Sequence, residues 1–375
     1  MNKKLSGLCR WMVIVSVFLV MTGCKANNNP ESSTAVINTT VLEEDEYGNT
    51  ILSVNSDDLL RAGFEFGDSL DIVFENGKKY NDIPFYSGYY NQPGEMLMLI
   101  YGSNEHPLLA INYGQFYESE NIEDGMKLEI SIHEKGKEIF TQEMGNLSYS
   151  NNREDYSSDE EFINAREVAV GNILPGMLYR SSSPFNPEIG RNEYASEYAG
   201  KHKISTVLDL EDDVEKMAAY GELPEYSQKL LDSNGVILNT MKIDYKSEDF
   251  SNKLVYGFSE LLKKDGPYLI NCKEGKDRTG FTAMVLGGLC EATVEELEED
   301  YMMSYQNYYG ITKSDEDRYE FFINGNFIPM LEYILDTDDF TLSGKEISDR
   351  TREYLLRIGM NEDDINMLKT KLTGK

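Results

Sequence analysis

A single segment, PYLINCKEGKDRTGFTAMVLGGLC at residues 267–290, constrains the fold more than any other part of this chain. An apolar run that is typical of a buried strand leads into Cys272, a short glycine-containing loop follows, and an apolar helical pattern begins near Thr279. A strand that continues through such a loop into a helix gathers backbone N–H groups and the positive end of the helix dipole at one point. The order of these elements predicts an anion-binding loop in an α/β domain.

Cys272 and Arg278 bound this loop, and their side chains suit phosphoryl chemistry. The loop amides would hold the three non-bridging oxygens of a phosphate and would stabilise the thiolate form of Cys272, which is the nucleophilic form. Arg278 offers a planar fork that binds two phosphate oxygens together. We therefore predict Cys272 as the nucleophile and Arg278 as the phosphate-binding arginine, with a substrate-binding loop made of Lys273, Glu274, Gly275, Lys276, Thr279 and Gly280.

The decapeptide NCKEGKDRTG is similar to the loop of the protein tyrosine and dual-specificity phosphatases, and within that superfamily to the GKDRTG form of bacterial secreted phosphatases. PGMLYRSSSPF, ISTVLDLEDDVE and EEDYMMSYQNYY resemble other recurring segments of the same bacterial family, so the resemblance covers about residues 165–330. It implies hydrolysis of phosphomonoesters through a phosphocysteine intermediate, with phosphotyrosine as the usual substrate. No cofactor is implied, and His106, His133 and His202 are too widely separated in the sequence to suggest a metal site.

The leaving oxygen of the ester needs a proton from a carboxylic acid, and two aspartates compete for this role. Asp244 ends a predicted strand 28 residues before Cys272, a spacing similar to that of the acid loop in dual-specificity phosphatases. Asp277 lies inside the loop, as in the KDR-type loop of myotubularin-like lipid phosphatases, and we favour it slightly. Asp212, in an acidic cluster that follows another strand, is a further candidate, although such clusters more often cap helices.

Two features of the loop leave alternatives open. Asn271 occupies the position where the family usually has a histidine, so a domain that binds phosphoryl groups without hydrolysing them is the alternative to an enzyme. Lys273 and Lys276 match lysines that contact additional phosphates in inositol-lipid phosphatases, which makes phosphoinositides or inositol phosphates candidate substrates. Glu274 between them, and the formal net charge of −31, oppose the binding of a polyanion.

The remainder of the chain divides by its hydrophobic pattern. Residues 163–372 alternate strand-like segments, such as 235–244, with helix-like segments, which predicts a cysteine-phosphatase-like α/β domain with a largely parallel sheet flanked by helices. The tail from Thr293 to Leu372 is mainly helical in pattern, and Thr293 with Glu296 predicts a capping box at its start. Residues 41–145 contain short alternating apolar runs separated by Gly, Asn and Pro, which predicts a small all-β domain. In KLEISI, for example, Leu128, Ile130 and Ile132 share one face, as a half-buried strand requires.

Part of the β region resembles the C-terminal β-barrel of the S-adenosylmethionine hydroxide adenosyltransferases. The resemblance rests on DEYGNT at 45–50, a Gly-Asp step at 67–68, and PGEMLMLIYGS before LLAINYGQF. The catalytic domain of that family has no counterpart in this sequence, so the resemblance implies a fold and no activity. We expect a spacer or substrate-presenting module.

The N-terminus has the composition of an export signal. A basic start, an apolar run and small residues precede Cys24, as in the lipobox of bacterial lipoproteins, so residues 1–23 are predicted as a signal peptide and Cys24 as a lipidated N-terminus. An uncleaved membrane anchor is the alternative. Residues 24–40, rich in Asn and Ser, are predicted as a flexible tether. We therefore expect an extracytoplasmic protein held at the membrane.

Charge and cysteine content exclude other classes of protein. Loss of residues 1–23 would remove three basic residues and no acid, giving a net charge of −34, which argues against nucleic acid as a partner. Only Cys272 and Cys290 would remain in the folded part, so no disulfide framework is expected. A scaffolding or adhesive lipoprotein, with the β domain as its binding surface and with exposed loops rich in tyrosine, is the alternative from a different functional class, and it is supported only by the 25 tyrosines of the chain.

Overall fold

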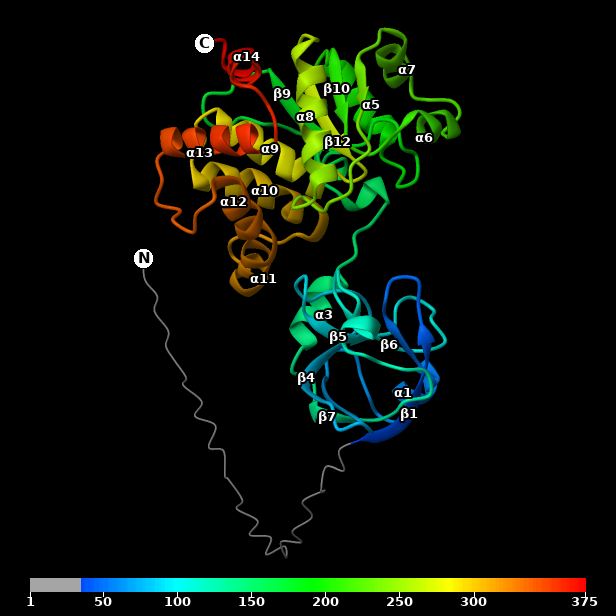
Figure 1. The fold of residues 1–375 in the computed structure, drawn as a ribbon. Coiled ribbons are helices and arrows are strands. Elements are labelled where there is room, and N and C mark those ends of the chain that lie inside the picture. Colours follow the sequence, from blue (N-terminus) through cyan, green and yellow to red (C-terminus); the bar gives the residue numbers. More distant parts are fainter. Residues whose placement is uncertain (1–34) are drawn as a thin grey trace, which may run out of the picture.

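The computed structural model describes residues 35–375, and the expected signal peptide and Cys24 lie outside this range. Figure 1 shows a β-barrel followed by a larger α/β unit. This confirms the predicted fold class, a small all-β region preceding an α/β region with a largely parallel sheet. Within residues 35–375, no helix combines the length and the apolar character needed to cross a bilayer.

The barrel is closed, so that none of its strands is left with an unpaired edge. Leu128, Ile130 and Ile132 are buried in its last strand, as the alternating pattern predicted. The strands follow the order β1 (Val36–Glu44), β2 (Thr50–Leu52), β6 (Leu108–Ile111), β5 (Met96–Leu99), β4 (Lys79–Tyr86), β3 (Ser69–Phe74) and β7 (Lys127–Glu134), and the short helices are α1 (Ser56–Arg61), α2 (Phe116–Ser119) and α3 (Ile139–Gly145).

Strand β1 begins earlier than the sequence indicated. Residues 36–40, which we expected in the flexible tether, pair with β7 in antiparallel register, for example Ile37 with Ile130. Their β-branched side chains favour a strand. The partner strand lies about ninety residues further along the chain, so local composition alone did not reveal the pairing.

The segment between the two units is anchored on a buried arginine. It contains the 3-10 helix η1 (Arg153–Asp155) and leads into α4 (Asp159–Phe162). Arg191 is fully buried, and its guanidinium lies 5.0 Å from the ring of Tyr149 and 5.2 Å from that of Tyr156. It also donates to the Ser150 carbonyl oxygen at 2.9 Å. Cation–π contacts and this hydrogen bond therefore hold the connecting segment against the α/β unit.

The α/β sheet places Cys272 at its centre. β10 and β12 are parallel neighbours, β9 lies parallel to β12 on the other side, and only the short edge strand β8 is antiparallel. The strand order is β11 (Val236–Leu238), β10 (Thr206–Asp209), β12 (Tyr268–Cys272), β9 (Leu178–Ser182) and β8 (Arg166–Glu167). The helices between these strands are α5 (Asn192–Lys201), α6 (Val214–Ala219), α7 (Glu225–Asp232) and α8 (Glu248–Leu262), and α9 (Asp277–Leu289) follows the last strand, β12.

Helices complete the chain, as its helical pattern predicted. Thr293 caps the first of them, and with Glu296 it forms the predicted capping box. In Figure 1 several of these helices gather around α9, whose side chains are buried from Thr279 onward. The helices after Cys290 are α10 (Val294–Tyr309), α11 (Glu316–Phe322), the π-helical turn η2 (Ile323–Phe327), α12 (Ile328–Leu335), α13 (Gly344–Arg357) and α14 (Glu362–Thr373).

Candidate active site

The predicted strand, loop and helix are present around Cys272. β12 ends at Cys272, a tight loop follows, and α9 begins at Asp277. Gly275 adopts φ +67°, and a Cβ atom there would clash with the Ser181 carbonyl group of β9. Only glycine satisfies both constraints, because it has no Cβ atom and tolerates a left-handed backbone. The loop is therefore packed directly against the neighbouring strand.

The carbonyl groups of the loop point outward, into a set of buried donors. Glu274 O accepts from Asn164 Nδ2 at 3.1 Å and from the Tyr308 hydroxyl at 2.6 Å. Gly275 O accepts from Asn164 Nδ2 at 3.1 Å and from Arg180 at 2.8 Å. In a trans peptide unit the C=O and the next N–H point in opposite directions. The following amides are thus directed to the other side of the loop, where the N–H groups of the first turn of α9 also lack intrahelical acceptors.

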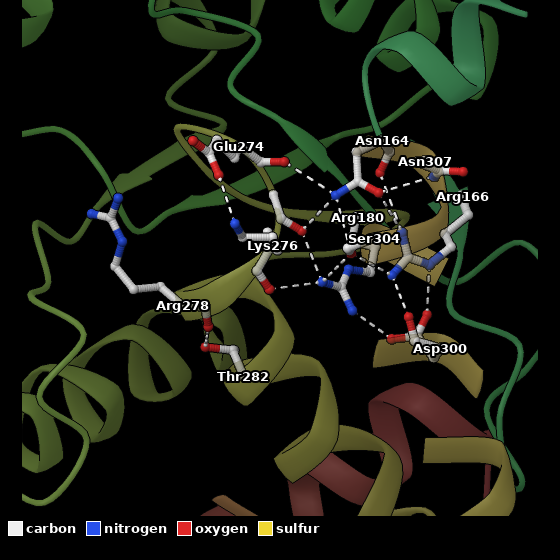
Figure 2. A network of polar contacts seen from close by, with 11 residues as sticks. Asn164, Arg166, Arg180, Glu274, Lys276, Arg278, Thr282, Asp300, Ser304 and Asn307 are labelled. Atoms are coloured by element: carbon white, nitrogen blue, oxygen red, sulfur yellow. Dashed lines mark hydrogen bonds and ion pairs between the residues drawn. The ribbon is translucent and has the colours of Figure 1, made fainter. Parts of the chain in front are cut away.

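Figure 2 shows the ionic network that holds these donors in place. Asp300 of α10 lies 2.5 Å from Arg180 and 2.8 Å from Arg166, and Arg180 is fully buried. Burial opposes ionisation of Asp300, but the charges of the two arginines outweigh it and lower the pKa of this carboxyl group. Ser304 and Asn307, also on α10, join the network through Asn164. The loop backbone is thus fixed by charges contributed from three separate segments.

Arg278 points away from this network in Figure 2. Its guanidinium donates to the carbonyl oxygens of Leu210 at 3.1 Å and Met241 at 3.0 Å, and it lies 2.5 Å from the Glu211 carboxylate. Burial disfavours the charged guanidinium, but the negative charges of Cys272 and Glu211 raise the pKa of Arg278. The loops that follow β10 and β11 therefore position this arginine.

Asn271, the residue at the usual histidine position, is fully buried. Its Nδ2 donates to Asp209 Oδ1 at 3.1 Å on the neighbouring strand. Burial, and then the charge of Asp212, raise the pKa of Asp209 well above its ordinary value. Burial also raises the pKa of Asp212, although a hydrogen bond from Tyr220 opposes this shift. A buried pair of carboxyl groups thus supports the residue that precedes the nucleophile.

The acidic cluster after β10 serves several purposes. Asp213 caps α6, accepting from the Lys216 backbone N–H at 2.8 Å, which is the role expected for such a cluster. Asp209 and Asp212 are buried, whereas Glu211 pairs with Arg278. The cluster therefore contributes an arginine partner that the sequence did not single out.

The two loop lysines are both paired with carboxylates. Lys273 lies 2.6 Å from Glu188, and Lys276 lies 3.3 Å from Glu274 and 3.0 Å from the Tyr309 hydroxyl. Burial opposes the charge on Lys276, but Asp277 and Glu274 raise its pKa well above the ordinary value. The side chain of Lys276 is only 13% exposed. The positive charge of Lys276 is thus largely paired with the carboxylates of Glu274 and Asp277 in the same loop.

The two main candidates for the general acid occupy different environments. Asp277 is the first residue of α9, with its side chain 42% exposed and 3.9 Å from Lys276. Asp244 is exposed in the loop between β11 and α8, because β11 ends at Leu238 rather than at the expected residue 244. The same loop reaches the site at Met241, which contacts Arg278.

The remaining predicted loop residues are packed beneath the site. Thr279 is fully buried, and its hydroxyl has no hydrogen-bond partner within residues 35–375. Gly280 lies against Tyr301, whose ring would be 2.9 Å from an added Cβ atom. No cluster of residues suited to a metal ion occurs in the described part of the chain.

Several residues of the site were not assigned a role from the sequence. Asn164, Arg180 and Asp300 orient the loop, and Tyr308 contributes a further donor. Arg180 and Asp300 fall within segments whose resemblance was noted, PGMLYRSSSPF and EEDYMMSYQNYY. These resemblances were the available signal, since the complete burial of β9, which requires a partner for the Arg180 charge, is seen only in the structure.

Comparison with known proteins identifies the α/β unit. A family model described as the tyrosine phosphatase family matches residues 160–374, more than half of the chain. No curated protein matches the chain. The family match does not extend to the barrel, so the resemblance of that region to an adenosyltransferase domain stays a prediction.

Solved structures show distant similarity. An uncharacterized conserved protein from Thermotoga maritima is 19% identical, with a TM-score of 0.23, and the match covers 26% of this chain and 36% of that one. A conserved hypothetical protein from Thermus thermophilus is 18% identical, with a TM-score of 0.18 and coverages of 25% and 34%. This chain thus spans about a third of both proteins. The core catalytic domain of the PP-IP phosphatase SIW14 from S. cerevisiae, in complex with citrate, is 22% identical, with a TM-score of 0.27 and coverages of 42% and 83%.

Proposed function

Because the chain belongs to the tyrosine phosphatase family, we propose that it hydrolyses phosphomonoesters with Cys272 as the nucleophile. The Cys272 sulfur forms a bond to phosphorus while the bond from phosphorus to the ester oxygen breaks. The leaving oxygen takes a proton from a carboxylic acid, for which we propose Asp277. Water then attacks the phosphocysteine, releases inorganic phosphate and regenerates the thiolate.

One observation carries this proposal, namely the outward-facing carbonyl groups of the loop. Asn164 and Arg180 hold Gly275 O, and Arg180 also donates to Lys276 O at 3.1 Å. The backbone N–H groups that point away from these carbonyl oxygens then form a fixed anion site beside Cys272, and the N-terminus of α9 adds partial positive charge. Donors that are already oriented stabilise transition-state charge without reorganisation during the reaction. Arg278 would complete this site by binding the equatorial oxygens.

The charges around the loop favour a substrate with a single phosphate, and we propose phosphotyrosine. A second phosphate near Lys276 would also approach Glu274, which lies 3.3 Å from that lysine. Burial opposes ionisation of Glu274, but Lys276 and a hydrogen bond from Tyr149 lower its pKa, so the carboxylate remains charged at neutral pH. Phosphate release from phosphotyrosyl peptide should therefore exceed release from phosphoinositides and inositol hexakisphosphate. The reverse order would assign the enzyme to inositol phosphates.

Alkylation provides a direct test of the nucleophile with an internal control. Cys272 and Cys290, the two free cysteines of residues 35–375, are buried, and burial raises the pKa of Cys290 to about 12. Iodoacetate at neutral pH should therefore modify Cys272 in the native protein and spare Cys290, as measured by mass spectrometry of peptides. Inorganic phosphate or vanadate should protect Cys272. Equal modification of both thiols, without protection, would contradict the proposed anion site.

Acid quenching during turnover separates an enzyme from a binding domain. The wild type should contain phosphate linked to the Cys272 sulfur, and the Cys272→Ser variant, which lacks this sulfur, should form no phosphocysteine. A different result would establish a domain that only binds phosphoryl groups. In that case phosphate protects Cys272 from alkylation, but no intermediate is trapped and phosphate release does not exceed background. A Cys272→Ser protein that retains every cellular effect would favour the scaffolding alternative.

The general acid can be assigned by pH–rate profiles. Asp277→Asn should abolish the basic limb of kcat/KM, with activated aryl phosphates least affected because their leaving groups need no proton. Asp244→Asn serves as the matched variant in the exposed loop. If Asp244→Asn alone removes the limb, the roles are reversed, and if neither variant does, both assignments fail.

We also propose that the protein is exported and held at the membrane through Cys24. The support is the sequence of residues 1–24, which lie outside the described structure. Cells given labelled palmitate should incorporate it into the wild type and not into a Cys24→Ser variant. Membrane association of that variant with residues 1–23 retained would instead identify an uncleaved anchor.

A further inference from the structure

A hollow of about 990 Å³ lies on the barrel, remote in sequence from the phosphatase loop. Four loops line it: the turn between β1 and β2, the loop between β4 and β5, the loop between β5 and β6, and the segment that follows β6. Its volume is within the range of small-molecule binding sites. None of the lining residues belongs to the α/β unit.

Exposed tyrosines gather at this hollow. Within residues 35–375, six tyrosine or phenylalanine side chains are 38% exposed or more, and Phe140 and Tyr256 are the two that lie elsewhere. The other four line the hollow: Tyr47 (70% exposed), Tyr89 (39%), Tyr101 (60%) and Tyr113 (74%). Large apolar surfaces that remain exposed in one place commonly mark a binding site. Tyrosine suits such a site because it combines a flat apolar face with a hydroxyl group and has few rotatable bonds.

Polar groups at the base of the hollow are fixed by hydrogen bonds. Asn49 is nearly buried, and its Nδ2 donates to Asp45 at 2.8 Å and to the Tyr89 hydroxyl at 3.0 Å. Asp45 also accepts from the backbone N–H groups of Tyr47 and Asn49. The turn is thus held in one shape, and the Tyr89 ring lies 6.3 Å from that of Tyr101. Such a surface is organised before any ligand binds, which reduces the entropic cost of binding.

The charge of the hollow selects against anions. No lysine or arginine is among its lining residues, whereas Asp45 contributes a carboxylate and the whole chain has a formal net charge of −31. Amide side chains supply both donors and acceptors, from Asn104, Asn112 and Gln115. A ligand that matches has an apolar face for the tyrosines and several hydroxyl groups for the amides, without negative charge.

From this combination we infer that the barrel binds a neutral carbohydrate. The C–H face of a sugar ring packs against a tyrosine ring, and its hydroxyl groups exchange hydrogen bonds with the amides and the carboxylate. A purely apolar peptide fits less well, because it would remove the side-chain amides of Asn104 and Gln115 from water without offering them hydrogen-bond partners. The inference is independent of the phosphatase chemistry, since the two sites share no residue.

Affinity electrophoresis of the purified protein, in native gels containing neutral glucan, mannan or xylan, tests this inference. At least one of these polymers should retard the wild type, and anionic alginate should not. The double variant Tyr47→Ala/Tyr113→Ala should bind at least tenfold more weakly, as judged from the polymer concentration that gives half-maximal retardation. Tyr256→Ala is the matched control, because Tyr256 is 51% exposed on α8, away from the hollow. This control should migrate as the wild type does.

Phosphatase activity and thermal unfolding serve as internal checks. The double variant should keep wild-type kcat/KM on an aryl phosphate and a wild-type melting temperature, because both tyrosines are exposed in the barrel. Lack of retardation by all three neutral polymers would overturn the inference. So would equal retardation of the double variant and the wild type, or retardation by alginate alone. Each of these results would leave the phosphatase assignment unaffected.

Discussion

Replacement of Asn164 by glycine should weaken both the fold and the catalytic loop. Asn164 is fully buried with φ +52°, a conformation that glycine adopts freely, so the change removes the side chain without backbone strain. Two hydrogen bonds to loop carbonyl oxygens are lost, while Tyr308 and Arg180 still donate to those oxygens. At about 1 kcal/mol for each of these two bonds, and about 0.5–1 kcal/mol for the added backbone entropy, we expect a loss of about 2.5–3 kcal/mol. The abandoned donors of Arg166 and Asn307 add to this loss.

In a domain of this size, a loss of about 2.5–3 kcal/mol lowers the melting temperature by about 5–12 °C, and the abandoned donors lower it further. The activity should fall further than the stability requires, because the loop amides become less well oriented. A misplacement of about 1 Å can reduce a rate by about 10²-fold, so we expect kcat/KM on phosphotyrosyl peptide to fall by about 10–100-fold. The inhibition constant of inorganic phosphate should rise in parallel.

The matched control is Asn234→Gly, because Asn234 has φ +56° but is exposed. It carries the same change in chemistry and backbone entropy, without contact to the loop. We expect its melting temperature to fall by only a few degrees, and kcat/KM to remain that of the wild type. Equal kcat/KM values for the Asn164 and Asn234 variants would refute the claim that Asn164 orients the loop.

Three further predictions concern other contacts of the site. Tyr149→Phe removes the 2.8 Å hydrogen bond to Glu274 and should cost about 1.5–3 kcal/mol of unfolding free energy by urea titration; an unchanged midpoint would contradict this. Arg278→Lys should lower kcat/KM by about 10²–10³-fold, because lysine cannot replace the planar fork, and activity close to wild type would contradict its role. The raised pKa of Asp209 means that the folded state binds its proton more tightly, so wild-type stability should decline as pH rises above the ordinary carboxyl range of about 4. Asp209→Asn should flatten this decline in melting temperature, and an identical pH dependence in both proteins would oppose the assignment.

The sequence predicted the parts of the site that lie close together in the chain. The strand before Cys272 and the helix after it follow from an apolar run, a glycine and a second apolar run, and the Thr293 capping box follows from residues three apart. Local patterns could not reveal that Arg180 donates to a carbonyl group 95 residues away. Such contacts depend on how β9 and α10 pack around the loop, which periodicity does not specify.

The strand expected over residues 235–244 shows how tertiary contacts override a local pattern. The β-branched residues Val236, Ile237, Thr240 and Ile243 favour a strand along this segment, yet β11 ends at Leu238. Beyond it, the Asn239 side chain donates to the Lys253 carbonyl oxygen of α8 at 2.9 Å, and the Met241 carbonyl accepts from Arg278. The chain leaves the sheet here in order to bind the arginine, so the misjudged strand end coincides with the site.

The buried ions behind the loop contribute geometry more than stability. Removing Arg180, Arg166 and Asp300 from water is costly, and well-packed apolar residues could stabilise the fold as well as an ion pair does. Apolar side chains could not, however, donate hydrogen bonds to Gly275 O and Lys276 O, as Arg180 does. Without such donors those carbonyl groups would turn elsewhere for partners, and the amides opposed to them would turn as well. The network therefore has a cost in desolvation free energy, but it fixes which side of each loop peptide faces the phosphate.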